Sequence, residues 1–388
     1  MAHPFRDVAI VGVHNTVQAR HLPDHDSQSI ALEGALGALA DAGVSPGDVD
    51  AVVGQFSADD VLTFGLGPAS RRFLSLGIPG LLDAAALIAT GQADVVLMSA
   101  GGAGIYTDRA ATAPWTRPAH EFVVGYGLFT AAEFALIARR HMLTFGTTPE
   151  QLATVAATIR NNGHVNPQAV YFGRGPFTPD DILASRMIAD PYHLLDCAMT
   201  AEGGCGLVLA RADRAASLRQ RPVWILGGGS DSFGPSYQIA PRWDLRGSSA
   251  DGIPNGYVGR RAARQAFAAS GLGPADVDVA ELYDPFSFEI IRQLEAYGFC
   301  AEGEGGPFVA DGHIGPGGSI PVTTDGGLMS FSHAGLSAQL LQRIIRGVEQ
   351  LRGNCATRQV PGAEVAICSN GGAGALFTDV LLLGRERP

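Results

Sequence analysis

An internal repeat constrains the fold of this chain more than any other feature. Residues 42–52 read AGVSPGDVDAV and residues 270–280 read SGLGPADVDVA, and each follows an alanine-rich helical pattern and precedes an apolar, strand-like run. A second pair, DVVLMSAGGAG at 94–104 and EVAICSNGGAG at 364–374, occurs in the same order. Chance similarity of short turns is the alternative, and the shared order argues against it. The chain is therefore predicted to contain two related halves.

Helix-like segments at 80–91 and 335–347 precede the second pair, so strands and helices alternate in both halves. Such alternation predicts mixed or parallel sheets that are covered on both faces. We expect an α/β chain with duplicated mixed-sheet halves in a layered α-β-α-β-α arrangement. The predicted units are an N-terminal half at 1–120, a helical insertion or lid at 121–195, a closing strand and helix at 196–220, and a C-terminal half at 221–388.

Composition narrows the classes of function. With 46% hydrophobic and 17% charged residues, the 388-residue chain is expected to be a well-buried globular enzyme. With a net charge of -11, the chain lacks the excess of basic residues that nucleic-acid binding requires. No apolar run reaches the roughly 18 residues of a membrane span, and no signal peptide is evident, so no membrane contact and a cytoplasmic location are expected. The five cysteines form no CxxC pair and the histidines no metal spacing, so no intrinsic metal is predicted.

Several motifs carry a family resemblance. ELYDPFS at 281–287 is similar to ELHDCFS of the sterol-carrier-type thiolases, TTDGGLMSFSHAG at 323–335 to their NTDGGLLSGGHPLG, and CSNGGAG at 368–374 to CIGGGxG. The stretch YGLFTAAEFALIARRHM at 126–142 also resembles this branch. These matches span most of the chain in the expected order, and the resemblance implies the thiolase fold.

One departure from the family bears on function. Where thiolases carry their nucleophilic cysteine, the family spacing places Leu74, which cannot be acylated. Ser75 has no identifiable activating base and is expected to be a helix cap. The Tyr-Asp-x-Phe order at 283–286 resembles the steroid side-chain-cleaving aldolases, which also lack the nucleophile but are expected to have tyrosine where this chain has His333. The resemblance implies an aldolase, a carbon–carbon lyase, that cleaves a bulky β-hydroxyacyl-CoA to a ketone and a shortened acyl-CoA without a covalent acyl-enzyme.

Such cleavage needs a base for the β-hydroxyl, an acid for the α-carbon and donors for the enolate oxygen. By the family positions, Tyr283, His333 and Cys368 are the candidate catalytic residues. Each also has a structural alternative: a core tyrosine, a hydrogen-bonding histidine and a packed thiol. Asp284 is expected to hold a turn or cap the following helix. Close backbone approach to the thioester, with N–H groups as oxyanion donors, is expected of the supporting glycines Gly326, Gly327, Gly371 and Gly372.

Other functions stay open at this point. A thiolase-like acyltransferase or Claisen-type enzyme would use His333 and Cys368, and a non-catalytic subunit of a hetero-oligomer would use neither. Coenzyme A is expected as part of the substrate and not as a bound cofactor, with Arg71 and Arg72 as candidates for its phosphates. The resemblance further implies a homodimer and a small zinc-ribbon and OB-fold partner protein.

Overall fold

The computed structural model describes residues 4–56, 58–66, 69–72, 76–104, 130–232, 258–334, 338–372 and 377–388. Nine strands follow the order β3-β2-β4-β7-β1-β8-β11-β10-β9. The first five are β3 (Ser70–Arg72), β2 (Ala51–Gly54), β4 (Val95–Gly102), β7 (Gly203–Arg211) and β1 (Val8–Asn15), and the last four are β8 (Val223–Ser232), β11 (Phe377–Gly384), β10 (Val365–Gly372) and β9 (Val279–Glu281). The two groups join where Ala9 and Ile10 pair with Trp224 and Val223.

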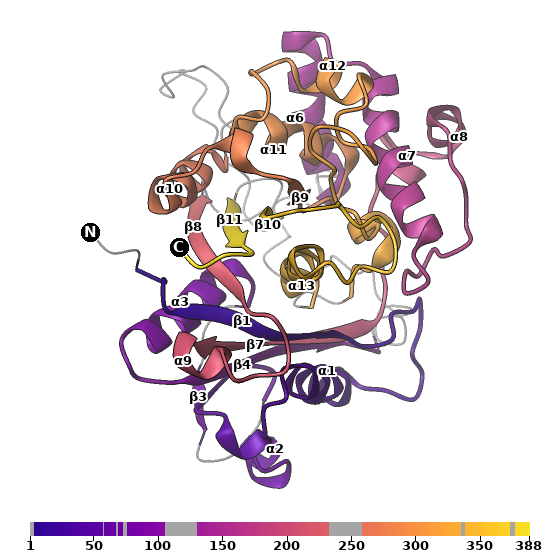
Figure 1. The fold of residues 1–388 in the computed structure, drawn as a ribbon. Coiled ribbons are helices and arrows are strands. Elements are labelled where there is room, and N and C mark those ends of the chain that lie inside the picture. The colour runs from indigo at the N-terminus through magenta and orange to yellow at the C-terminus, as the bar shows by residue number, and fades with distance from the viewer. Residues whose placement is uncertain are drawn as a thin grey trace.

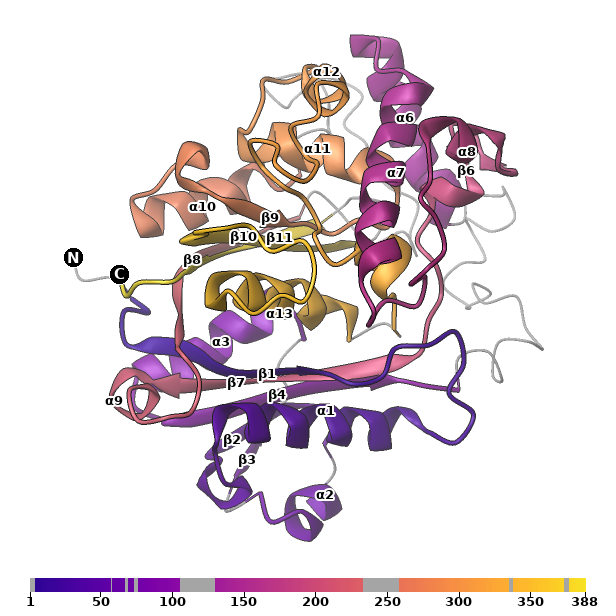
Figure 2. The ribbon, with the colours of Figure 1, turned by 45° about the vertical axis from the view of Figure 1, so that its right-hand side comes forward.

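The predicted layered arrangement is confirmed (Figures 1 and 2). Figure 2 shows the two sheet layers edge-on, with helices α3 (Ile78–Ala89) and α13 (Gln339–Arg352) between them. Helix α1 (Ser27–Ala42) covers the outer face of the first layer, and α10 (Arg260–Ser270) and α11 (Ser287–Tyr297) cover the outer face of the second. The middle helices are covered on several sides, and α13 accordingly buries eleven of its fourteen residues, five of which are glutamine or arginine.

The repeated DVD turns make the same pair of hydrogen bonds in both halves, which explains the repeat. Asp50 Oδ2 accepts hydrogen bonds from the N–H groups of Asp94 and Val95, at 2.8 and 2.9 Å, where β4 begins. Asp278 Oδ2 accepts the matching bonds from Glu364 and Val365, also at 2.8 and 2.9 Å, where β10 begins. Each carboxylate therefore sets the register between two parallel strands, β2 with β4 and β9 with β10.

The segment predicted as a helical insertion carries helices α6 (Thr130–Phe145), α7 (Pro149–Val165) and α8 (Pro179–Ala184), which lie together beside the second layer (Figure 2). Thr148 begins α7 with a capping box that pairs it with Gln151, as its Thr-Pro-Glu sequence predicts. Within the described ranges, α-helices also form at α2 (Ala58–Thr63), α9 (Ala212–Ala215) and α12 (Gly305–Ala310). The proposed domain boundaries and the lid role of the insertion stay predictions. Within the described ranges, no helix has the length and apolarity needed to cross a bilayer.

Candidate functional site

Tyr283 lies two residues after the end of β9, and its backbone is fixed on both sides. Its N–H donates to Ser369 Oγ at 2.8 Å, and its carbonyl accepts from Gln293 Nε2 at 2.7 Å. Ser369 Oγ in turn donates to Gln293 Oε1 at 2.5 Å, which closes the network. A Cβ at Gly371 would lie 2.9 Å from Tyr283 Cδ1, so this glycine makes room for the tyrosine ring. The phenol is thus held in a site where only 7% of the residue is exposed.

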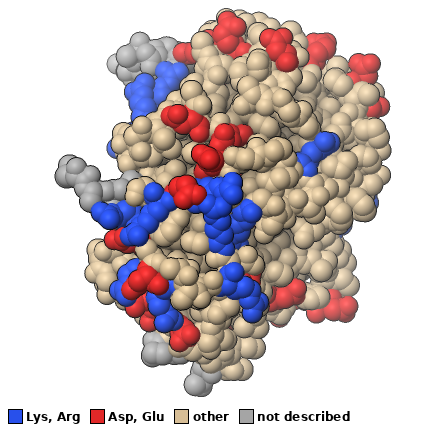
Figure 3. All heavy atoms as spheres, viewed as in Figure 1, with Lys and Arg blue, Asp and Glu red and all other residues tan. Residues whose placement is uncertain are grey.

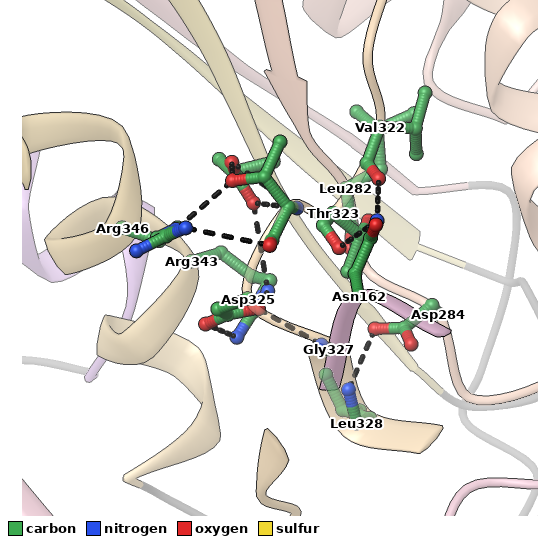
Figure 4. Close-up of polar contacts among 12 residues, drawn as sticks. Asn162, Leu282, Asp284, Val322, Thr323, Asp325, Gly327, Leu328, Arg343 and Arg346 are labelled. Carbon is green, nitrogen blue, oxygen red and sulfur yellow. Dashed lines mark hydrogen bonds and ion pairs between the residues drawn. The ribbon is translucent and has the colours of Figure 1, made fainter. Parts of the chain in front are cut away.

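Asp284 holds a neighbouring segment in place. Its carboxylate accepts from the N–H group of Leu328 at 2.8 Å (Figure 4) and from that of Met329 at 3.2 Å. Both residues belong to the short π-helix η6 (Gly327–Phe331). The residue is fully buried, and burial raises the pKa of its carboxyl to about 7. The expectation that Asp284 caps the helix that follows it is wrong, because Phe286 is the N-cap of α11. Its structural role is to anchor η6.

Gly327, in the TTDGG segment, allows Asp284 to approach η6 closely. The N–H of Gly327 donates to Asp325 Oδ1 at 2.8 Å, so it is already engaged and does not match the expected oxyanion donor. Gly327 has φ of 58°, and a Cβ there would lie 2.1 Å from Asp284 Oδ2 and 2.4 Å from Thr323 Cγ2. Only glycine fits both the left-handed backbone and the close approach.

The substitution Gly327→Ala is therefore expected to destabilise the protein by about 3 kcal/mol, from left-handed strain plus overpacking. Gly65→Ala is the matched control, since Gly65 has φ of 61° but no atom lies within 4 Å of the place that a Cβ would take. Urea unfolding of both variants measures the difference. Equal losses would mean that the contact with Asp284 adds nothing to the backbone strain.

His333 follows η6 and is half-buried. The preceding Ser332 donates from Oγ to Gln18 Oε1 at 2.7 Å, and Gln342 Nε2 donates to the same oxygen at 3.0 Å. The carbonyl of His333 itself accepts from the N–H of Ala201 at 3.4 Å. Residues of the N-terminal half therefore position a candidate catalytic residue of the C-terminal half, which the sequence did not indicate.

Cys368 lies on β10 with its thiol turned toward α13. The residue is fully buried, and a Cβ at Gly347 would lie 2.6 Å from its Sγ. Burial raises the pKa of the thiol well above its ordinary value, so it stays protonated at neutral pH. Its role in proton transfer stays a prediction. Gly372 continues β10 and pairs with Phe377.

The position of the lost nucleophile, Leu74, lies outside the described residues, as does Ser75. Helix α3 begins just after them with Gly77 as its N-cap, so the expected cap at Ser75 is wrong. In its place, Asn370 Oδ1 accepts from the N–H of Ile78 at 2.8 Å, while Asn370 Nδ2 donates to the carbonyl of Leu340 at 2.9 Å. Asn370 thus joins the starts of both middle helices.

Arg71 and Arg72, the candidates for phosphate binding, form β3 by their backbone, and their side chains lie outside the described part of the structure. On the face drawn in Figure 3, arginines are interspersed with acidic residues. The ion pairs among the described residues include Arg352–Asp41 at 2.9 Å and Arg214–Asp48 at 3.8 Å. No group of three or more potential metal ligands comes together in the described part of the chain.

A buried charge cluster, not predicted from the sequence, supports the site. Both terminal nitrogens of Arg343 donate to Asp325, each at 2.6 Å, and Glu281 lies 3.6 Å from the same guanidinium (Figure 4). Burial raises the pKa of Asp325, but the Arg343 charge outweighs it and the net pKa is lowered. For Glu281, burial wins and raises the pKa to about 7. Thr324 links the cluster to α13, since its Oγ1 accepts from Arg346 Nε at 2.9 Å.

Comparisons with known proteins identify the family of this chain. A family model described as thiolase C-terminal domain-like matches residues 256–385. A steroid side-chain-cleaving aldolase of Thermomonospora curvata is 33% identical over 98% of both chains. A 17-hydroxy-3-oxo-4-pregnene-20-carboxyl-CoA lyase of Mycobacterium tuberculosis is 34% identical over 94% of this chain and 96% of that protein. An acetyl-CoA acetyltransferase of Methanothermobacter thermautotrophicus is 33% identical over 95% of this chain and 97% of that protein.

Solved structures give the same result. The Ltp2-ChsH2(DUF35) aldolase superposes with a TM-score of 0.83 at 30% identity, covering 98% of both chains. Human mitochondrial 3-ketoacyl-CoA thiolase, at 16% identity and a TM-score of 0.67, shares the fold. The chain therefore belongs to the thiolase superfamily, in the branch of thiolase-like carbon–carbon lyases that includes the steroid side-chain-cleaving aldolases.

Proposed function

We propose that this chain cleaves a bulky β-hydroxyacyl-CoA, with a steroid-like ring system, into a ketone and a shortened acyl-CoA by a retro-aldol reaction without a covalent acyl-enzyme. The observation that carries the proposal is the cysteine distribution: the first of the five is Cys197, so none precedes or begins α3. Ping-pong acyl transfer needs an acylated nucleophile there. The names of the aldolase and lyase relatives support the direction of the reaction.

The sequence also restricts how the enolate can be stabilised. Its 27 basic residues are all arginines, so no lysine of these 388 residues is available to form an imine with a carbonyl substrate. The proposal instead uses the thioester carbonyl itself as the electron sink. Tyr283 and His333 share two tasks: accepting the proton of the β-hydroxyl and donating a hydrogen bond to the thioester oxygen, where negative charge develops.

The test is to incubate the protein with a panel of β-hydroxyacyl-CoA thioesters that includes 17-hydroxy-3-oxo-4-pregnene-20-carboxyl-CoA. Mass spectrometry follows ketone and shortened acyl-CoA, and intact-protein mass follows any covalent adduct. Release of both products without an adduct is expected, and it should be lost in His333→Ala. An acyl adduct on the protein, with no ketone released, would favour acyl transfer, the activity named for the Methanothermobacter relative.

We also propose that a small partner protein assists the reaction. The support is the name of the similar aldolase structure, Ltp2-ChsH2(DUF35), which names ChsH2(DUF35) together with Ltp2. Co-purification with a DUF35 protein encoded beside this chain is the measurement, and an activity that is full in its absence would argue against the requirement. A homodimer and a cytoplasmic location remain proposals of the same kind, which sedimentation and fractionation would check.

A further inference from the structure

Glu133 on α6 is a buried carboxyl with no part in the roles given to Tyr283 and His333. Only 2% of the residue is exposed, and neither carboxyl oxygen has a hydrogen-bond partner. Thr130 Oγ1, one helical turn earlier, is also buried without a partner. Residues three apart share a helix face, so the first turn of α6 presents unpaired polar atoms on one side. Unpaired buried polar groups are rare in native proteins because each is costly, and they are found where function requires them.

The start of α6 packs against Phe286, two residues after Asp284. The ring of Phe134, next to Glu133, is 4.8 Å from the ring of Phe286, the fourth residue of the Tyr-Asp-Pro-Phe sequence. The ring of Tyr192 also stacks on Phe286, at 4.9 Å, and its hydroxyl donates to the carbonyl of Phe134 at 3.5 Å. These contacts fix the first turns of α6 relative to the candidate site.

Other buried acids near the site are already engaged. Asp284 accepts two backbone N–H groups, Asp325 holds Arg343, and Glu281 accepts from Thr324 Oγ1 at 2.5 Å. Among the described residues, Glu133 is the carboxyl with both oxygens buried and unpaired. Burial raises its pKa to about 8, and no charged group contributes to the shift. The side chain is therefore a neutral acid at pH 7, the form that can give up a proton.

We propose that Glu133, and not the thiol of Cys368, is the acid that protonates the α-carbon in the cleavage step, an inference that rests on the proposed function. The base removes the β-hydroxyl proton, the oxygen forms the ketone, and the bond between the α- and β-carbons breaks. Its electron pair becomes the enolate of the thioester. The enolate carbon then takes the proton of Glu133, which is left as a carboxylate and recovers a proton from the base through solvent. No oxidant, reductant or water is consumed.

Hydrogen exchange isolates this step from bond cleavage. Cleavage of 17-hydroxy-3-oxo-4-pregnene-20-carboxyl-CoA releases propionyl-CoA, and the reverse of the protonation removes an α-hydrogen of propionyl-CoA. In D₂O, the wild-type protein is expected to exchange that hydrogen for deuterium. Glu133→Gln should lower both exchange and ketone release by about 100-fold or more, the usual range for a lost general acid. Glu150→Gln, which changes an exposed carboxyl at the start of α7, should leave both rates unchanged.

The outcomes separate the two proposals. Glu133→Gln that exchanges and cleaves within a few-fold of an active wild type would overturn the role of Glu133 and leave the proposed function standing. If the wild-type protein cleaves no β-hydroxyacyl-CoA of the panel, the proposed function fails and the role of Glu133 fails with it. Glutamine closely matches the protonated carboxyl in shape, so the variant is expected to fold.

A stability measurement tests the burial independently. Since the folded-state pKa of Glu133 is raised, its contribution to stability is fully present below the ordinary pKa near 4.5 and is lost as the pH rises through 8. The glutamine of Glu133→Gln does not ionise, so the variant does not lose this stability. Its free energy of unfolding relative to wild type should therefore increase between pH 5 and pH 9. A difference that is flat over this interval would mean that the carboxyl is hydrated in the folded protein and would overturn the proposal.

Discussion

Replacing Tyr283 by phenylalanine is expected to lower ketone release from a β-hydroxyacyl-CoA by about 100-fold or more while the fold is retained. The reason is that the hydrogen bonds of Tyr283 with Ser369 and Gln293 are made by its backbone N–H and carbonyl, so phenylalanine keeps both. Loss of the hydroxyl removes either the base for the β-hydroxyl or a donor to the thioester oxygen. Steady-state kinetics with product analysis by mass spectrometry measures the loss.

Tyr297→Phe is the matched control. Tyr297 is 2% exposed, and its hydroxyl donates to Gln293 Oε1 at 3.1 Å in the same hydrogen-bond network. Its loss should cost about 1 kcal/mol of stability with cleavage within a few-fold of wild type. If both tyrosine variants lose the same activity, the network as a whole supports the site and the phenol of Tyr283 has no separate role.

Deuterium exchange sharpens the assignment of Tyr283. A base for the β-hydroxyl is not needed to remove an α-hydrogen from propionyl-CoA, so exchange should survive Tyr283→Phe if the phenol is that base. If the phenol instead stabilises the enolate oxygen, exchange and cleavage should fall together. In either case His333 is left with the other task, because Tyr283 and His333 divide two tasks: accepting the β-hydroxyl proton and donating to the thioester oxygen.

The duplicated fold could be predicted because its cause is local. Each DVD turn is a short stretch in which the second aspartate accepts hydrogen bonds from two N–H groups at the start of a parallel strand that pairs with its own, so the same residues recur in both halves. The candidate residues Tyr283 and His333 were found through motifs that keep their order along the chain. The order of these motifs locates the two residues in the chain, but it does not show which chemical task each of them performs.

The supporting contacts could not be predicted because they join distant residues. Gln18 meets Ser332 across 314 positions, and Asp284 meets Leu328 across 44. No pattern of hydrophobicity marks such pairs. Glu133 had a weak signal, an acidic residue inside an otherwise apolar stretch of α6, AAEFALIA. Such a residue in a buried helical face indicates either a partner or a function, and the structure provides no partner.

Arg343→Met is expected to destabilise the protein by about 3–5 kcal/mol, the usual cost of removing one member of a buried ion pair. The guanidinium is fully buried, and its loss leaves Asp325 and Glu281 without the cation that offsets their desolvation. Arg211→Met is the control, because Arg211 also makes two hydrogen bonds to one carboxylate, at 2.8 and 3.0 Å, but its side chain is 39% exposed. Its loss should lie within the error of a urea titration.

A second substitution distinguishes electrostatics from packing. Asp325→Asn keeps an oxygen that accepts the N–H of Gly327 and removes the negative charge. If the loss in Arg343→Met comes from unpaired buried charge, adding Asp325→Asn should restore part of the stability, whereas losses from packing alone would add. The loss should also be smaller at pH 5 than at pH 8, since without Arg343 burial raises the pKa of Asp325, and a raised carboxyl pKa favours folding at low pH. The cluster holds Gly327 at the start of η6, so the activity of the same variants tests whether it also helps to position His333. If the double variant recovers stability but not cleavage, the charges of the cluster, and not the stability of the fold, set the position of the site.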